Sequence, residues 1–449
     1  MIPGLLDKYD RRVPRYTSYP TAPQFDDRVK AQDYRGWLAA LDPDLPLSLY
    51  LHIPFCDSLC WFCACHTKIV RRYAPVAAYL ELLLGEIDLA AGVLGQGRGV
   101  CHLHLGGGTP TVLEADGLAR LFDRLRRRFA LRPGAEIAVE SDPRELTDEV
   151  AAVLGRVGVT RASLGLQDIN PEVQRAVNRV QSFEQTARAA ELLRAAGVGS
   201  INIDLMYGLP HQTVERLLAT VEAALRLAPE RVCLFGYAHV PWMMKHQRLI
   251  DEAALPGPAG RFAQFQAAAA RLEEGGYVWI GLDHFALPGD PLAIAAREGS
   301  LHRNFQGYTT DDAPVRLGFG ASAIGLLPQG HVQNAVPLRA YRDAVAGGRL
   351  PVARGLALDD DDRLRAAVIE RLMCDLEVDL EKLCREFDCA PGVFAAELSD
   401  LAPMQADGLV VVEQASISVT EQGRPFVRTV CAVFDRYLQP DKVSHVRAV

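Results

Sequence analysis

The sequence predicts an α/β protein built on a partial (β/α)6 barrel, with an N-terminal arm and a mainly helical, winged-helix-like C-terminal domain. Short apolar strands alternate with amphipathic helical segments from residue 46 to about residue 285, and this alternation predicts a parallel sheet with right-handed crossovers. Polar or glycine-rich residues follow strand after strand, at the end where such barrels bind ligands. Six or so strand–helix units are too few to close an eight-stranded barrel, so we expect an open one.

The length of 449 residues suggests two or three domains. The composition, with 49% hydrophobic and 23% charged residues, fits a globular protein. No apolar run is long enough to cross a bilayer, and the N-terminus lacks the basic region and apolar core of a signal peptide. We therefore expect a cytoplasmic protein without a membrane span, a location that suits free thiols. The net charge of −8 argues against general nucleic-acid binding.

Residues 1–45 are predicted to form an arm. Pro14 and Pro20 punctuate a stretch with neither a helical nor a strand period, so we expect the arm to be extended. The arm either packs on the barrel as ordinary structure or covers an active-site mouth, where Arg15 or Tyr19 could contact a substrate.

Residues 46–350 are predicted to form the barrel and its extension. The expected strands are 47–52, 101–105, 137–140, 162–167, 201–206, 232–237 and 277–281. The expected helices include 76–93, 118–129, 183–196, 214–227 and 261–274, in which apolar residues recur at helical spacing. Residues 286–350 show no clear period and are expected to be irregular.

Residues that could bind a ligand stand where these strands end. The glycines of residues 106–111 either let the backbone approach a charged ligand closely or form a plain turn. Glu140 and Asp204 offer acceptors for a ribose diol or a cationic amine, and Gln167 can both donate and accept. Arg179 can pair with a carboxylate or can be a solvated charge on a helix face. Because the strand ends meet at one side of a barrel, we expect a single site there.

Residues 355–449 are predicted to form the C-terminal domain. The expected helices are 363–372, 380–387, 393–405 and 425–438, and the expected strands 408–413 and 416–420 form a wing. Asp361 or Asp362 is expected to cap the first of these helices. The domain is not basic, so a lid or packing role is favoured over DNA binding.

A cysteine-rich loop follows the first strand. Cys56, Cys60 and Cys63 have the spacing Cys-x-x-x-Cys-x-x-Cys, and three thiolates can hold three irons of a 4Fe–4S cluster while the fourth iron stays open. The alternative is a closed zinc knuckle made by Cys60, Cys63, Cys65 and His66. The six cysteines outside this loop stand among apolar residues, and most of them are expected to be buried.

The cysteine spacing after an apolar strand resembles the radical S-adenosylmethionine (SAM) superfamily. Further motifs resemble one family within it, the oxygen-independent coproporphyrinogen III oxidases. They are Pro-Arg-Tyr-Thr-Ser-Tyr-Pro-Thr at 14–21, Tyr-Leu-His-Ile-Pro-Phe-Cys at 50–56, Cys-Ala-Cys-His at 63–66, Gly-Gly-Gly-Thr-Pro-Thr at 106–111, Val-Glu-Ser-Asp-Pro-Arg at 139–144, Asp-Leu-Met-Tyr-Gly-Leu-Pro at 204–210 and His-Arg-Asn-Phe-Gln-Gly-Tyr-Thr at 302–309. The resemblance covers nearly the whole chain and implies a radical SAM barrel.

The resemblance implies an enzyme of haem biosynthesis that converts coproporphyrinogen III to protoporphyrinogen IX without oxygen. Two propionate side chains would lose CO2 and become vinyls, while SAM is cleaved at the 4Fe–4S cluster to methionine and a 5′-deoxyadenosyl radical. The implied partners are the substrate and an electron donor for the cluster, and we expect a monomer. A tetra-anionic substrate requires basic residues near the barrel mouth, for which Arg15, Lys245 and Arg303 are candidates.

Residue roles are implied by motif position. Cys56, Cys60 and Cys63 would hold the cluster, and Cys65 would be needed for activity without being a ligand. The cluster-bound SAM would contact Tyr50, Gly107, Glu140 and Ile324. A second SAM molecule would contact Phe62, Gly108, Thr109, Gln167, Arg179, Asp204 and Ala238.

The alternative function is that of a haem chaperone of the same superfamily, which binds haem without oxidase activity. Relatives of that kind resemble this chain around the first three cysteines but lack the fourth cysteine and the arm motif. Both features are present here, and they favour the enzyme.

Overall fold

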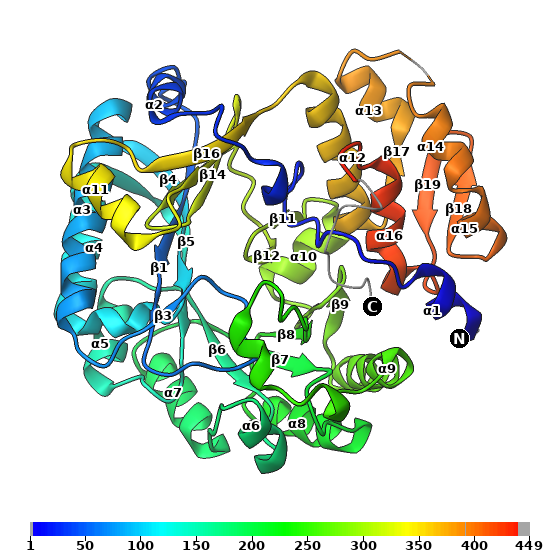
Figure 1. Ribbon diagram of the computed structural model, residues 1–449, viewed down its shortest axis with the longest axis horizontal. Coiled ribbons are helices and arrows are strands. Elements are labelled where there is room, and N and C mark those ends of the chain that lie inside the picture. The colour runs from blue at the N-terminus through cyan, green and yellow to red at the C-terminus, as the bar shows by residue number, and fades with distance from the viewer. Residues whose placement is uncertain (1–2, 391, 439–449) are drawn as a thin grey trace.

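The structure is a computed structural model that describes residues 3–390 and 392–438. Its centre is a 12-stranded sheet with the order β16-β15-β14-β13-β1-β4-β5-β6-β7-β8-β10-β9. Strands β1 and β4 to β8 run parallel and curve into an open barrel (Figure 1), as predicted. Their bounds are β1 Leu47–Ile53, β4 Arg98–Gly107, β5 Phe129–Ser141, β6 Arg161–Gln167, β7 Ser200–Tyr207 and β8 Arg231–Gly236.

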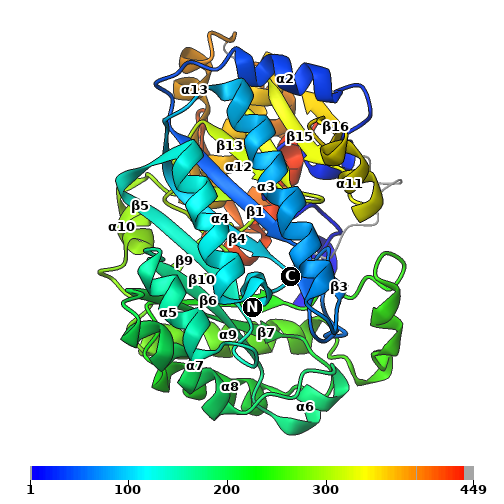
Figure 2. The same cartoon turned by 90° about the vertical axis from the view of Figure 1, so that its left-hand side faces the viewer.

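Helices connect these strands and cover the outer face of the barrel. They are α3 Ala74–Leu94, α4 Glu114–Arg128, α5 Asp148–Arg156, α6 Pro171–Ala176, α7 Phe183–Ala195, α8 Val214–Arg226 and α9 Pro258–Glu274. Figure 2 shows α3 and α4 side by side over β1 and β4. Leu118, Leu121 and Leu125 of α4 are buried toward the sheet, which is the helical spacing that the sequence shows.

The strand expected at 277–281 does not continue the parallel series. Instead, β9 (Val278–Ile280) and β10 (His284–Ala286) form an antiparallel hairpin, and β10 pairs antiparallel with β8. The few residues between β9 and β10 cannot form a crossover, so the chain turns back on itself.

The segment 286–350 is more regular than expected. It contains α10 Pro291–Glu298, β11 His302–Asn304, β12 Gly307–Thr309, β13 Val315–Phe319, β14 Ile324–Leu327, β15 Gly330–Asn334 and α11 Leu338–Ala346, and β16 Val352–Ala357 follows. β13 pairs parallel with β1, and β14 to β16 continue the sheet as antiparallel strands. β15 is buried along its whole length although it reads Gly-His-Val-Gln-Asn, so it carries no apolar alternation that the sequence could reveal.

The arm is not extended throughout, because it contains two helices, α1 (Pro3–Tyr9) and α2 (Ala31–Ala39). The stretch between them does lack regular strand structure, as its prolines indicate. α2 packs on α3, on the barrel side of the molecule, whereas α1 lies beside the C-terminal domain (Figure 1).

The C-terminal domain consists of short helices and a small antiparallel sheet. Its elements are α12 Asp360–Asp375, β17 Glu377–Asp379, α13 Leu380–Glu386, α14 Ala395–Asp400, α15 Ala402–Ala406, β18 Val410–Glu413, β19 Ser416–Val419 and α16 Val427–Cys431. The wing has three strands, since β17 joins the two that were expected. Residues 439–449 of the predicted domain lie outside the described residues.

Three details of this domain differ from expectation. Asp359 caps α12, in place of Asp361 or Asp362, because its side chain accepts from the backbone N of Asp362 and the Asp362 carboxylate accepts from the backbone N of Asp359. The helix expected at 393–405 is split into α14 and α15, since Pro403 has no N–H with which to continue a helix. The helix expected at 425–438 shortens to α16 between two 3-10 turns.

Two large apolar cores, with two smaller clusters beside them, hold the described residues together. The larger one lies between the barrel sheet and its helices, and the smaller one is shared by the arm and the C-terminal domain, where Leu5, Tyr9 and Tyr16 pack with residues such as Phe426 and Val430. Among the described helices, none is both long and apolar enough to cross a membrane.

Candidate active site

The cysteine loop leaves the carboxyl end of β1 and is closed by a short parallel pair of strands. β2 (Phe55–Cys56) pairs with β3 (Lys68–Ile69) on either side of the loop. The side chains of Cys56, Cys60 and Cys63 line one cavity of about 170 Å³, which we call the cluster cavity.

The glycine turn after β4 lies directly against this loop. Gly108 N donates to Ile53 O at 2.9 Å, and Thr109 N donates to Phe55 O at 2.7 Å. A Cβ atom on Gly108 would lie 2.4 Å from Phe55 O, so only glycine lets the two backbones come this close. The turn therefore serves a close approach as well as a change of direction.

Most of the residues that the sequence singles out line the cluster cavity together. Besides the three cysteines they are Phe62, Cys65, Gly107, Gly108, Thr109, Glu140, Gln167, Arg179 and Asp204. Tyr50 instead lines a neighbouring cavity inside the barrel, and Ile324 lines a third cavity beside the arm. Ala238 lines none of these three cavities, but the Gln247 side chain donates to both the Ala238 and Phe62 carbonyls at 3.1 Å.

Arg179 is buried beside the cysteine loop and is not a solvated charge. Its Nη1 donates to the Cys60 thiol at 3.4 Å and to Asp142 at 3.0 Å. Arg144 donates to the same Asp142 carboxylate at 2.6 Å and approaches the Cys60 sulfur at 3.9 Å. Burial opposes ionisation of Asp142, but the two arginines lower its pKa below the usual range. The site thus places a net positive charge beside Cys60.

Two carboxylates, Glu140 on β5 and Asp204 on β7, face the barrel interior on either side of β6, and their pKa values are shifted in opposite directions. Burial alone would raise the pKa of Glu140, but hydrogen bonding to His104 and Gly107 N, each at 3.1 Å, holds it below the usual range. Burial raises the pKa of Asp204 to about 6, although Ser163 and Asn202 donate to it. Asp204 lies in the middle of β7 and not at its end, so its side chain points into the barrel and not across its rim.

The residues present fit an iron–sulfur cluster and a polar nucleotide ligand. The hydrogen bond with Cys65 lowers the pKa of Cys63 to about 7 despite burial, which favours the thiolate that binds iron. Two buried atoms at the cavity, Gln167 Oε1 and Arg179 Nε, have no hydrogen-bond partner within the protein. Buried polar atoms are normally paired, so these two indicate a missing polar ligand.

The zinc alternative is not supported by the arrangement of its four ligands. Within residues 3–390 and 392–438, the group of potential ligand atoms that converges within 4.8 Å is that of Cys101, His102 and Asp311, away from the cysteine loop. The thiols of the loop do not converge on a single point, as the closed tetrahedral ligation of zinc requires.

Comparison with known proteins identifies the family. Residues 50–224 match the Radical SAM superfamily, and residues 358–426 match the HemN C-terminal domain. An oxygen-independent coproporphyrinogen III oxidase of Bradyrhizobium diazoefficiens is 51% identical over 440 residues, which cover 98% of this chain and 98% of that protein. The chain belongs to the oxygen-independent coproporphyrinogen III oxidase family.

Another member of this family, from Escherichia coli, is 43% identical over 437 residues, covering 97% of this chain and 95% of that protein. The solved structure of the Escherichia coli coproporphyrinogen III oxidase HemN, a radical SAM enzyme, matches with a TM-score of 0.90 and 41% identity, and it covers 95% of this chain and 100% of that chain. The chain is therefore an oxidoreductase that oxidises coproporphyrinogen III without oxygen in haem biosynthesis, with a 4Fe–4S cluster and SAM as cofactors.

Some residues that shape this family's site were missed in the sequence. His246 Nε2 donates to Cys63 O at 2.7 Å and Gln247 Nε2 donates to Phe62 O, so two hydrogen bonds tie the loop after β8 to the cysteine loop. Thr67 donates to the Cys56 sulfur at 3.2 Å. No spacing in the sequence links the partners of these contacts, so the sequence alone does not reveal them. Arg144, by contrast, belongs to the motif at 139–144 and stands two residues after Asp142.

Proposed function

We propose that this chain catalyses the oxidative decarboxylation of two propionate side chains of coproporphyrinogen III, giving the vinyl groups of protoporphyrinogen IX. The proposal is carried by one observation: this chain, a member of the oxygen-independent coproporphyrinogen III oxidase family, places three thiols, a glycine turn and buried unpaired polar atoms around a single cavity. When bound there, the cluster and SAM supply the radical that removes a hydrogen atom from the propionate. Each propionate must then lose CO2 and one electron to become a vinyl group.

The proposed roles of the residues follow from their places. Cys56, Cys60 and Cys63 hold the cluster, and the positive pair Arg144 and Arg179 stabilises negative charge on the thiolate at Cys60. Gly107 and Glu140, which bond each other, are proposed to bind the SAM on the cluster together with Tyr50 and Ile324.

A second SAM molecule is proposed beside the first. Its proposed contacts are Phe62, Gly108, Thr109, Gln167, Arg179, Asp204 and Ala238. The unpaired Gln167 Oε1 and Arg179 Nε support this part of the proposal, because both atoms belong to the proposed set. Cys65 is proposed to act in turnover without binding iron, and its place in the same cavity supports a role near the substrate.

Further parts of the proposal concern the setting of the enzyme. We propose an arm at 1–45, a barrel with its extension at 46–350 and a C-terminal domain at 355–449. β16, at Val352–Ala357, still belongs to the barrel sheet and favours a division just after it. We also propose a monomer that works in the cytoplasm and receives electrons from an external donor; the ten free cysteines are consistent with a reducing compartment.

An anaerobic assay tests the function. Reduced protein with SAM and coproporphyrinogen III is expected to release CO2 and 5′-deoxyadenosine and to form protoporphyrinogen IX. Cys60→Ala is expected to lose both the cluster absorbance and SAM cleavage, whereas Cys65→Ser is expected to keep the cluster and lose most turnover. Stoichiometric haem binding by wild-type protein that forms no protoporphyrinogen would instead establish the chaperone.

A further inference from the structure

Three cavities lie in a row through the molecule. The seam cavity, of about 370 Å³, lies between the arm, the β11–β12 hairpin and α12. The barrel cavity, of about 250 Å³, lies inside the strands and shares Asp311 and Arg316 with the seam cavity. At its other end the barrel cavity shares Cys65, Glu140, Ser163 and Asp204 with the cluster cavity. Neighbouring cavities therefore share walls in turn, from the arm to the cysteine loop.

Two arginines of the seam cavity have guanidinium nitrogens without an acceptor. Nε and Nη1 of Arg303 are buried and make no hydrogen bond within the protein, while Nη2 reaches Arg15 O at 3.5 Å. The guanidinium lies over the Tyr308 ring, with its carbon 4.3 Å from the ring centre. Nε of Arg316 is likewise buried without a hydrogen-bond partner. Buried donors of charged groups are costly to leave unpaired, so these arginines indicate an anionic ligand.

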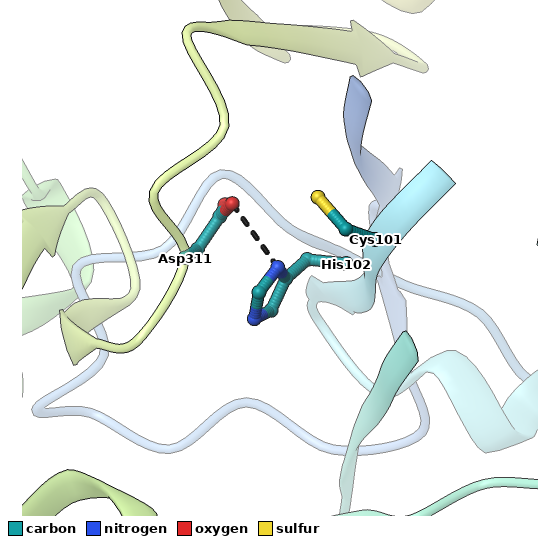
Figure 3. A group of neighbouring side chains, drawn as sticks. All are labelled: Cys101, His102 and Asp311. Atoms are coloured by element: carbon teal, nitrogen blue, oxygen red, sulfur yellow. Dashed lines mark ion pairs between the residues drawn. The ribbon is translucent and has the colours of Figure 1, made fainter. Parts of the chain in front are cut away.

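The acids of the seam cavity make no hydrogen bond to the unpaired nitrogens of these arginines. Asp311 lies 3.6 Å from Arg316 Nε, but it forms a closer ion pair with His102 Nδ1 at 3.2 Å (Figure 3) and accepts from Ala313 N. Burial opposes both charges, yet the ion pair holds the pKa of Asp311 at about 2 and that of His102 at about 10. Asp311 thus directs Oδ1 to His102 and Ala313 N and leaves only Oδ2 for Arg316, at a distance longer than a hydrogen bond. Of the other two acids, Glu370 is paired with His302 at 3.0 Å, and Asp312 is exposed.

We infer that the seam cavity binds carboxylates of the substrate that are not reacting, one at Arg303 and one at Arg316. The inference rests on the proposed function, because coproporphyrinogen III carries four flexible propionates and only one reacts at a time. Planar guanidinium groups are suited to pair with carboxylates through two hydrogen bonds. Aromatic side chains of the same cavity, Tyr16, Tyr19 and Phe305, offer an apolar wall to the macrocycle.

The position of Arg316 would determine the orientation of the bound substrate. Because Arg316 lines both cavities, a propionate held there lies at the entrance of the barrel cavity. The edge of the macrocycle next to this propionate then faces the barrel cavity, which borders the cluster cavity. Binding at the two arginines would therefore orient the substrate so that a third propionate enters the barrel.

Direct binding of the substrate tests the inference. Anaerobic equilibrium ultrafiltration with coproporphyrinogen III, followed by oxidation of the bound fraction to fluorescent coproporphyrin, gives the Kd without any turnover. Arg303→Gln and Arg316→Gln are each expected to raise the Kd about tenfold, the cost of one charge-assisted pair. Arg303→Lys and Arg316→Lys are expected to recover part of the loss. Arg363→Gln is the matched control, since Arg363 lines the same cavity but is already paired with Asp360 and Pro328 O.

The outcomes separate the inference from the function. If wild-type protein does not bind coproporphyrinogen III, the proposed function fails as well. If wild-type protein binds it and folded Arg303→Gln and Arg316→Gln variants bind equally well, only the inference is wrong. Should an arginine variant not fold, Ala367→Phe keeps both charges and fills the seam cavity from α12. It is expected to raise the Kd at least tenfold, and an unchanged Kd would overturn the inference.

Discussion

Asp142 holds two arginines beside the thiol of Cys60, and the loss of its charge should lower the free energy of unfolding strongly. Its carboxylate accepts from Arg144 at 2.6 Å and from Arg179 at 3.0 Å, and all three side chains are largely buried. Asp142→Asn would leave two adjacent guanidinium groups with one countercharge fewer. Removing one partner from a buried ion pair costs about 3–5 kcal/mol. We expect a loss of this size in the free energy of unfolding, measured by denaturant titration of the apoprotein, together with less iron per chain after reconstitution.

Asp148→Asn is the control for this change, because Asp148 pairs with Arg188 at 2.7 Å on the surface, where both side chains are more than half exposed. Surface ion pairs contribute about 0–1 kcal/mol. Equal stability of the Asp142→Asn and Asp148→Asn proteins would show that the buried pairing is not what holds the two arginines.

Glu86 is a buried carboxylate of α3 whose titration should appear in the stability of the protein. Its oxygens accept from Gly320 N, Asn334 Nδ2 and Tyr341 OH, and burial nevertheless raises its pKa to about 7. An unfolded glutamate ionises near pH 4.3, so the folded protein binds the extra proton between about pH 4.3 and pH 7. The stability from this group is therefore complete below pH 4.3 and is lost as the pH rises through 7.

Glu86→Gln should remove this pH dependence. Relative to wild type, we expect the variant to gain stability between pH 5 and pH 8, by an amount on the order of a few kcal/mol. Urea unfolding midpoints of both proteins across that range measure the difference. A constant difference between the two proteins at all these pH values would mean that the pKa of Glu86 is not raised in the folded state.

The strands and helices of the barrel could be predicted from the sequence because apolar residues recur in it periodically. β1, β4 and the helices α3, α4 and α8 present apolar residues at the spacing of their own element, and glycine and cysteine motifs mark the adjoining loops. β15 could not be read, since its polar residues are buried by pairing with β14 and β16. α1 could not be predicted, because its apolar residues pack against the C-terminal domain, about 400 residues away in the sequence.

The site residues, too, could be predicted where a motif or spacing in the sequence marks them. The residues on motifs, such as Cys56, Gly108 and Glu140, were predicted together and lie in one cavity. His246 was missed, because its contact with Cys63 O depends on how the loop after β8 folds over the cysteine loop. Spacing in the sequence reveals residues that act from one element, whereas contacts between elements require the tertiary structure.

The turn between β4 and the 3-10 helix at Pro110–Leu113 should be intolerant of even one methyl group. Gly108→Ala would place a Cβ atom 2.4 Å from the Phe55 carbonyl oxygen, a backbone atom that cannot move without the cysteine loop. We expect this variant to fold but to bind SAM at least tenfold more weakly, because the loop and the turn must separate. Isothermal titration of the reconstituted protein with SAM measures the effect.

Gly99→Ala is the matched substitution at the other end of β4. There the added Cβ atom would meet the Arg132 side chain, whose flexible end can move aside. SAM affinity within about twofold of wild type is expected for it. If Gly108→Ala also bound SAM normally, the close approach of the turn to the cysteine loop would be irrelevant to binding.

In the molecule as a whole, the arm contributes side chains to both of the two largest apolar cores. The larger core fills the barrel, and the smaller one takes Leu5, Tyr9, Tyr16 and Tyr19 from the arm into the C-terminal domain. Polar contacts support the same junction: Arg428 donates to the Val13 and Pro14 carbonyls, and Tyr16 OH donates to Asp435 at 3.1 Å. The arm thus belongs structurally to the domain at the opposite end of the chain, which closes the seam cavity between them.

Loosening this junction should affect the two cores unequally. Tyr9 is 1% exposed, packs edge-on against Phe426 and donates to Asp407 at 2.5 Å. Tyr9→Ala would leave a cavity and would remove one of the hydrogen bonds to Asp407, which keeps its ion pair with Lys8, at a cost of about 3–5 kcal/mol to the smaller core. Hydrogen exchange is then expected to become faster in residues 364–434 and to stay unchanged in β4 to β7, since locally stable units open independently.

Tyr34→Ala, which cuts an equally buried side chain out of the barrel core, should give the reverse pattern. Uniform acceleration in both variants would show that the barrel and the C-terminal domain unfold as one unit, and that the arm does not join two separate cores.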